Sequence, residues 1–80
     1  MSYEMEQALD AAYVMPTFGR SPVEFVRGDG MRLTDSEGRV YLDFLAGIGV
    51  CSLGHGHPAL MQALEAQVPK LLHVSNYYYV

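Results

Sequence analysis

The first stretch of the chain repeats apolar positions with the period of a helix. Apolar residues recur at positions 5, 8, 9, 12 and 13, and acidic or amide side chains occupy most of the positions between them. This spacing is typical of an amphipathic helix. Ser2 is a suitable N-cap, because its hydroxyl can accept a backbone N–H, and Pro16 prevents the helix from continuing. We therefore expect a helix over residues 1–15, followed by an irregular linker that contains Pro16, Gly19 and Pro22.

From Val23 to Phe44 the period of the apolar positions changes to two. Apolar and polar residues alternate in three short runs, near residues 23–25, 31–33 and 40–44, and this pattern indicates short strands. The runs are separated by "RGDG" and "DSEG", each of which ends in a glycine that can adopt the positive φ of a tight turn. We expect a three-stranded antiparallel meander over residues 23–44 with one apolar face. Such a sheet needs a further layer to be stable in water.

A second helical pattern follows a glycine-rich stretch. Apolar residues recur at positions 60, 61, 64 and 68, and Pro69 follows them. Pro58 fits the first helical position, because the N–H that proline lacks would be unpaired there. The pattern predicts a helix over residues 58–68. The stretch before it, "AGIGVCSLGHGHP" from Ala46 to Pro58, is the main candidate for function.

This loop could bind phosphate or form the wall of a pocket, and its glycines favour the wall. They stand at positions 47, 49, 54 and 56, a spacing that matches neither common nucleotide-binding motif. The helix that follows begins with a proline, which lacks one of the N–H donors that an anion needs. The glycines on both sides of Ile48 remove side-chain bulk, so that a ligand or a second chain can approach the backbone.

A metal site in the loop is also disfavoured. Zinc needs three or four ligands, and neither Cys51 nor His73 completes a recognised spacing with His55 and His57. The favoured interpretation is that the glycines beside these histidines let the backbone turn sharply, while His57 caps or packs at the start of the helix.

Three other reactive groups have a structural interpretation that we favour. Cys51 lacks a third group that would orient a base, so we expect a small buried thiol. Lys70, the only lysine, is expected to be solvated and not to form a Schiff base. Tyr77 to Tyr79 are expected to form a buried strand and not a stacking platform. The sequence thus predicts no catalytic, cofactor-binding or metal-binding residue within these 80 positions.

Composition suggests a part of a larger protein. Half of the residues are apolar and 18% are charged, whereas an average soluble chain has about 25% charged residues. A chain of 80 residues buries only about 60% of its unfolded surface. Because the last ten residues, "LLHVSNYYYV", carry no charged group, we expect an N-terminal segment that continues beyond Val80.

Charge and cysteine content exclude several classes of partner. The net charge is −4, and the five basic residues are scattered, so there is no basic patch for nucleic acid. A single cysteine and a first segment without the features of a signal peptide favour a cytoplasmic location. No apolar run approaches the roughly 18 residues of a membrane span.

The motifs together resemble a known family. The stretches "RGDGMRLTDSEGRVYLDFLAGIGVCSLGHGHP" and "ALMQALEAQVPKLLHVSNYYY" are similar to the N-terminal region of class III aminotransferases, fold type I enzymes that use pyridoxal phosphate. The similarity covers Pro16 to Tyr79. It implies an α/β fold class: an N-terminal segment with a helix, an antiparallel meander, a glycine-rich loop and a helix. Residues 1–80 would form part of the small domain and of the interface of a homodimer.

The resemblance also implies roles for individual residues. Phe18 stands where the family places an aromatic residue near the substrate entrance. Ile48 stands where it places a specificity residue, with Gly49 and Val50 beside it along the substrate cavity. Ornithine δ-aminotransferases typically have tyrosine at the position of Ile48, so isoleucine favours an acylated or otherwise different amine donor. The Schiff-base lysine and the other groups that hold pyridoxal phosphate are expected beyond Val80, so this segment alone would be inactive.

Within the family, the sequence most resembles members of arginine biosynthesis that transfer the amino group of N-acetylornithine to 2-oxoglutarate. Members that use 4-aminobutyrate or succinylornithine are the alternatives. A different class of alternative is a non-catalytic truncated product that acts only as an interaction module.

Overall fold

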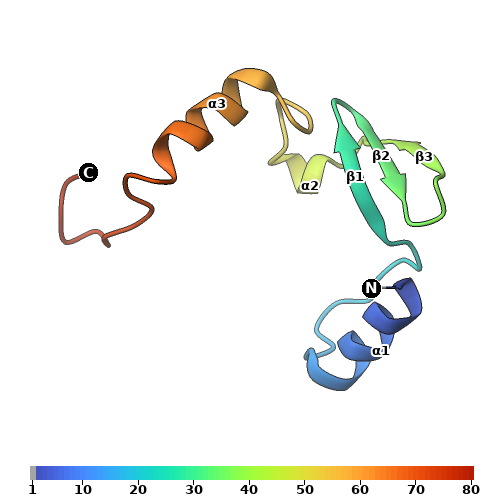
Figure 1. Cartoon of the computed structure of the whole chain (residues 1–80). Coiled ribbons are helices and arrows are strands. Elements are labelled where there is room, and N and C mark those ends of the chain that lie inside the picture. Colours follow the sequence, from blue (N-terminus) through green and yellow to red (C-terminus); the bar gives the residue numbers. More distant parts are fainter. Residues whose placement is uncertain (1) are drawn as a thin grey trace.

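The structure is a computed structural model that describes residues 2–80. It contains a helix, a three-stranded antiparallel sheet, a short turn of helix and a further helix (Figure 1), and this order confirms the expected α/β segment. The elements are α1 (Tyr3–Tyr13), β1 (Phe25–Asp29), β2 (Arg32–Asp35), β3 (Val40–Leu42), α2 (Ala46–Gly49) and α3 (Pro58–Gln67).

Helix α1 begins and ends through local backbone effects. The Oγ of Ser2 accepts a hydrogen bond from the N–H of Met5 at 3.2 Å, as expected of an N-cap. The helix ends at Tyr13 and not at residue 15, because Val14 already has extended dihedral angles. Position 1 of the expected range lies outside the described residues.

Helix α3 is capped by a histidine and begins with a proline. The Nδ1 of His57 accepts a hydrogen bond from the N–H of Ala59 at 3.2 Å, and Pro58 occupies the first turn. This confirms the interpretation of His57 as a cap. The helix ends at Gln67, where the expected range ran to residue 68, and Val68 is its C-cap.

The sheet is a meander with strand order β1-β2-β3 and antiparallel pairing throughout. Gly30 and Gly38 have φ values of 59° and 85° at the two connections, so both are in the left-handed conformation that turns require. The register shifts between Phe25 and Arg27, which is the mark of a bulge in β1.

The apolar residues of the sheet lie on both faces, and the expectation of one apolar face was wrong. Leu33 pairs with Tyr41, whereas Val40 pairs with Thr34. Directly paired residues share a face and successive residues alternate, so Val40 and Leu42 lie on the face opposite to Leu33. The period-two pattern is correct within each strand, but it does not reveal the register between strands.

The tyrosines near the C-terminus do not form a strand. Residues 76–78 form a turn and a bend, and Tyr77, Tyr78 and Tyr79 are exposed. The expectation of a buried strand was therefore wrong for this chain. A strand needs a neighbour for its N–H and C=O groups, and the sheet of the described residues ends with β3.

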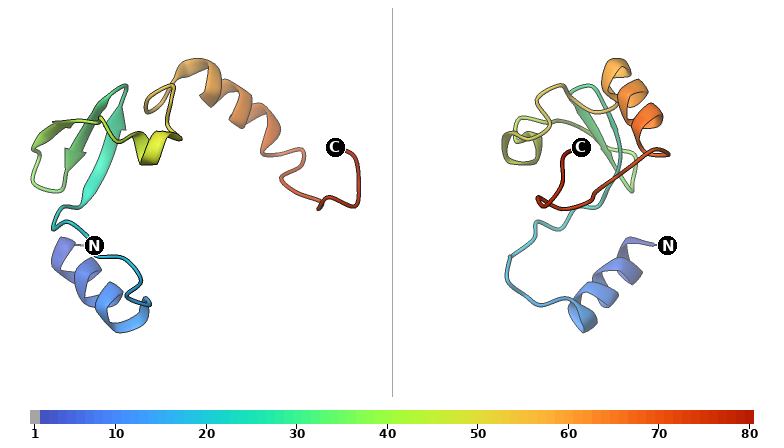
Figure 2. Two further views of the ribbon diagram at one scale, coloured as in Figure 1. Left: turned by 180° about the vertical axis from the view of Figure 1, so that it is seen from behind. Right: turned by 90° about the vertical axis from the view of Figure 1, so that its left-hand side faces the viewer.

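The described residues form no hydrophobic core. Asp35 is the only buried residue among them, and no large apolar side chain is buried. Figures 1 and 2 show the two long helices extending away from the sheet on different sides, and no helix packs on a strand. The radius of gyration is 16.5 Å, compared with about 12 Å for a compact domain of this length. No described helix has the length and apolar character of a membrane span.

Candidate functional site

The glycine-rich loop is closed at its base by His55. The N–H and C=O of His55 pair with the C=O and N–H of Gly30 at 2.7 and 2.9 Å. Its Nε2 donates to Asp43 Oδ2 at 2.7 Å. Asp43 Oδ1 accepts the N–H of Ala46 at 2.8 Å. These contacts connect both ends of the loop to each other and to the turn between β1 and β2.

The environment of Asp43 suits an acceptor of two hydrogen bonds. Its side chain is only 8% exposed and that of His55 is 26% exposed. The hydrogen bond from the N–H of Ala46 and that from His55 lower the pKa of the Asp43 carboxyl, and burial opposes them. The carboxylate therefore stays ionised at neutral pH and acts as an acceptor for both partners.

Two glycines make the closure sterically possible. A Cβ atom at Gly28 would lie 2.6 Å from Cγ of His55. A Cβ atom at Gly54 would lie 2.7 Å from the carbonyl oxygen of Gly30, and Gly54 also has a φ of 78°. Both distances are shorter than real contacts of a Cβ atom allow. The His55 ring and the carbonyl group of Gly30 therefore occupy the space that a side chain at Gly28 or Gly54 would need.

The short element α2 is a left-handed turn. Its four residues, Ala46 to Gly49, have φ values of 52°, 62°, 67° and 79°. The N–H groups of Ile48 and Gly49 both donate to the carbonyl oxygen of Leu45 at 3.0 Å. A residue other than glycine in this conformation is disfavoured by roughly 1–2 kcal/mol. The glycines at 47 and 49 thus provide the left-handed backbone, a role that the sequence interpretation did not include.

An open hollow of about 510 Å³ lies between the loop and the turn that joins β1 and β2. Cys51, which is half-buried, lines it together with Asp43 and Ala46. The thiol is thus less buried than expected. No group of three or more histidine, cysteine or acidic side chains suited to a metal occurs among residues 2–80.

The predicted lining residues are exposed in this chain. Ile48 is 83% exposed at the tip of the left-handed turn, and Gly49 and Val50 follow it. Phe18 is 80% exposed in the linker between α1 and β1. Figures 1 and 2 show this linker beside α1 and away from α2. The chain thus brings Ile48, Gly49 and Val50 together but does not bring Phe18 to them. Lys70 is exposed, as expected.

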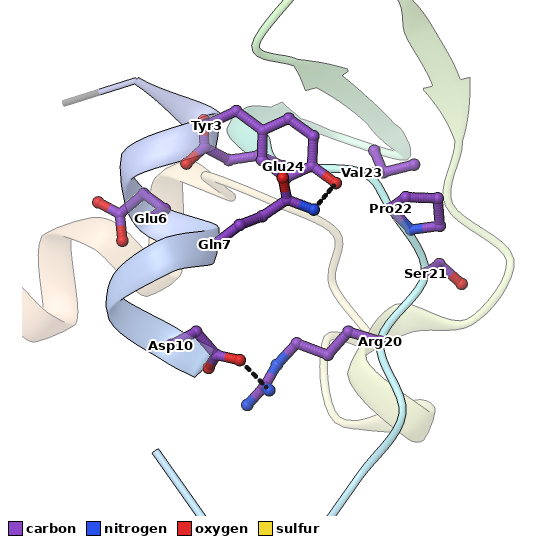
Figure 3. A pocket seen from close by; sticks show the side chains of 9 residues that line it. All are labelled: Tyr3, Glu6, Gln7, Asp10, Arg20, Ser21, Pro22, Val23 and Glu24. Atoms are coloured by element: carbon purple, nitrogen blue, oxygen red, sulfur yellow. Dashed lines mark hydrogen bonds and ion pairs between the residues drawn. The ribbon is translucent and has the colours of Figure 1, made fainter. Parts of the chain in front are cut away.

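A second hollow of about 370 Å³ lies between α1 and the linker (Figure 3). Arg20 reaches across it to Asp10, with 2.9 Å between Nη1 and Oδ2, and Gln7 donates to the hydroxyl of Tyr3 at 3.0 Å. Both ionic side chains are largely exposed, and such pairs contribute about 0–1 kcal/mol. The ion pair ties the linker that carries Phe18 to α1.

The turn between β2 and β3 is organised by the buried carboxylate of Asp35. Its Oδ1 accepts the N–H groups of Glu37 and Arg39 at 2.9 and 2.8 Å. Its Oδ2 accepts Nε of Arg39 at 2.7 Å and the hydroxyl of Tyr41 at 3.1 Å. Burial raises the pKa of this carboxyl, but these four hydrogen bonds outweigh it and lower the pKa from 3.8 to about 2.

Sequence reasoning missed Asp43 and assigned no contact to the His55 ring. A signal for Asp43 was present, because an aspartate three residues before a glycine-rich stretch can accept a backbone N–H as an N-cap does. The contact with His55 spans 12 residues, and no local pattern indicates it.

Comparisons with known proteins agree on one family. The model described as Aminotransferase class-III matches residues 14–79. An acetylornithine aminotransferase of Synechocystis sp. is 57% identical over 68 residues, which are 85% of this chain and 16% of that protein. Another from Aquifex aeolicus is 61% identical over 66 residues, 82% of this chain and 18% of that protein.

Solved structures show the same similarity. The crystal structure of acetylornithine aminotransferase from Elizabethkingia anophelis aligns with a TM-score of 0.87 and 31% identity, covering 100% of this chain and 21% of that one. The chain therefore spans about a fifth or less of the length of the proteins it matches.

Proposed function

The chain belongs to the class III aminotransferases, and on that premise we propose that it is the N-terminal part of an acetylornithine aminotransferase. The complete enzyme would transfer the amino group of N-acetylornithine to 2-oxoglutarate, a step in arginine biosynthesis in the cytoplasm. The observation that carries this proposal is the identity of 57–61% to two proteins of that name, over more than four-fifths of the chain.

Pyridoxal phosphate is the cofactor that the family implies, and two features of the described residues argue against a site for it among them. Lys70 is exposed, just after α3. The glycine-rich loop, which could be a phosphate site, is occupied at its base by the His55 ring and its contacts. We therefore propose that the groups holding the cofactor lie in the remainder of the enzyme. The cofactor stabilises the carbanion that transamination requires.

We assign the loop the role of a cavity wall. Ile48 stands exposed on a strained backbone turn, which holds an apolar side chain in a fixed place at low entropic cost on binding. Gly49 and Val50 continue the wall, and Phe18 contributes an aromatic side chain near the entrance. An apolar wall at Ile48 suits the neutral acetylated α-amino group of N-acetylornithine better than the charged α-amino group of ornithine.

The exposed apolar surface supports the proposed assembly. Phe44, Leu45 and Leu72 are all more than two-thirds exposed in the single chain, and exposed apolar patches mark interaction surfaces. We propose that the remaining domain and the second subunit of a homodimer cover them.

The test uses the complete enzyme with its cofactor. N-acetylornithine and 2-oxoglutarate are supplied, and glutamate formation is measured for a panel of amine donors. We expect the highest kcat/KM with N-acetylornithine, ahead of succinylornithine, 4-aminobutyrate and ornithine. A higher value for another donor would replace the proposed substrate, and no transamination with any donor would refute the proposed activity.

The variant Ile48→Tyr tests the wall directly. Tyrosine introduces a large side chain with a hydroxyl, so the preference for N-acetylornithine over ornithine is expected to fall by roughly tenfold, the size of one pocket contact. An unchanged preference would show that Ile48 does not line the cavity. Val26→Tyr, at an exposed strand position outside the loop, is the matched control.

A further inference from the structure

A continuous path of hydrogen bonds leads from the sheet to the turn that carries Ile48. The main chain of His55 is fixed by two hydrogen bonds to Gly30. Its ring donates to Asp43 at 2.7 Å, and the second oxygen of Asp43 accepts the N–H of Ala46 at 2.8 Å. Ala46 is the first residue of the left-handed turn.

The strain of the turn makes such a path necessary. Ala46 and Ile48 have φ values of 52° and 67° without being glycines. Strained residues keep their conformation only where the surrounding contacts over-determine it. The hydrogen bond from the N–H of Ala46 to Asp43 is the side-chain contact that fixes the main chain of Ala46. The backbone hydrogen bonds from Ile48 and Gly49 to Leu45 and from Cys51 to Ala46 remain without it. None of them holds the N–H of Ala46, so loss of the Asp43 contact lets the turn shift and carry Ile48 with it.

The His55 ring is itself held from two sides. Asp43 fixes its Nε2, and the main chain of Gly28 lies so close that a Cβ atom there would be 2.6 Å from Cγ of the ring. Gly28 does not have a positive φ, so its backbone tolerates alanine. A methyl group at this position would act by displacing the ring.

We infer that Asp43 and His55 are positioning residues that select the amine donor, because they fix the left-handed turn and with it the place of Ile48. This inference rests on the proposed function, in which Ile48 lines the substrate cavity. Asp43 and His55 act on the turn and not on the reacting atoms.

The specificity ratio of the complete enzyme tests this inference. It is kcat/KM for N-acetylornithine divided by kcat/KM for ornithine. Both values come from one preparation, so the amount of folded, cofactor-loaded enzyme cancels and a loss of stability alone leaves the ratio unchanged. We expect His55→Ala and Asp43→Ala each to lower the ratio by about tenfold, the size of one apolar pocket contact.

Further variants test whether the His55 ring acts through its hydrogen bond to Asp43 and through its position. In His55→Gln the amide nitrogen can replace Nε2 as the donor to Asp43, so the ratio is expected to recover towards the wild-type value. Gly28→Ala is expected to lower the ratio, since it displaces the ring. The double variant Gly28→Ala, His55→Ala is expected to match His55→Ala alone, because no ring remains to be displaced.

His57→Ala is the matched control. It removes the same side chain two positions later, where the ring caps α3 and is exposed. Its ratio is expected to stay at the wild-type value. An unchanged ratio in both His55→Ala and Asp43→Ala would overturn the inference.

The proposed function and this inference fail in different ways. If the wild-type enzyme does not use N-acetylornithine, the proposed substrate is wrong, and the ratio is taken between its two best donors. If the wild-type enzyme uses no amine donor, the inference is tested by amide hydrogen exchange of residues 46–50. We then expect faster exchange in His55→Ala than in the wild type and in His57→Ala, and equal exchange would overturn the inference.

Discussion

The carboxylate of Asp35 ties the β2–β3 turn to both of its flanking strands. The pKa of this group is about 2, below its ordinary value of 3.8, because four hydrogen bonds outweigh the effect of burial. The ionised form therefore stabilises the turn; this contribution is complete above about pH 5 and is lost as the pH falls through about 2. We expect the amides of Glu37 and Arg39 to lose protection against hydrogen exchange across that window, measured by NMR on the complete protein.

Asp35→Asn is the control for this pH dependence. The side chain of asparagine does not ionise. The backbone amides of Glu37 and Arg39 should therefore be less protected at neutral pH than in the wild type, and titration at position 35 should no longer change their protection between about pH 5 and 2. Constant protection in the wild-type protein over the same range would contradict the assignment.

Alanine substitutions at two glycines of the loop distinguish the cost of backbone strain from the cost of steric overlap. Gly54 and Gly56 have similar φ values, 78° and 73°, but a Cβ atom meets the carbonyl of Gly30 only at Gly54. We expect Gly56→Ala to destabilise the protein by about 1 kcal/mol through strain alone. Gly54→Ala should destabilise it by a further 1–3 kcal/mol or so through the overlap. Equal losses, measured by urea unfolding of the complete protein, would show that the contact with Gly30 is not maintained.

At this scale the sequence reveals local geometry and hides long-range contacts. The positive φ of Gly30 and Gly38 and the cap at His57 were predictable, because each depends on neighbours within a few residues. The contact between Asp43 and His55 was not, because it depends on the pairing of His55 with Gly30, which is far away in the sequence.

At the scale of elements, α1 depends on its cap, since none of its residues is buried. Ser2→Ala removes the hydrogen bond to the N–H of Met5, and loss of such a cap costs about 1 kcal/mol. We expect the amides in the first turn of α1 to exchange severalfold faster. Ser2→Asp, which retains an acceptor, should show wild-type exchange; fast exchange in this variant as well would assign the effect to something other than the cap.

The kinds of element and their order were predictable, but their relative placement was not. Periods of 3.6 and 2 distinguish helices from strands within a single segment. The face on which Val40 and Leu42 lie depends on how β3 pairs with β2, a register that the hydrogen bonds of Asp35 to Arg39 and Tyr41 support. The tyrosines near the C-terminus have strand-forming side chains, but the fold here offers them no neighbouring strand.

At the scale of the whole molecule, the absence of a core among residues 2–80 predicts the behaviour of the chain in isolation. Hydrophobic burial must offset about 1–2 kcal/mol of backbone entropy per residue, and residues 2–80 bury no large apolar side chain. We expect the isolated chain of 8.9 kDa to show no cooperative thermal transition in calorimetry. A stable monomer in sedimentation with a sharp transition would contradict the proposal that other protein surfaces cover it.

The contact between Gly30 and His55 has a consequence for how the enzyme can diversify. Because Asp43 and His55 hold the loop from outside its tip, and Gly54 leaves room for the carbonyl of Gly30, the anchoring does not depend on the side chains of Ile48 and Val50. Substitutions at the tip leave the anchors and the strands in place. On the proposed function, a different amine substrate would require changes at these tip positions and not in the sheet that supports them.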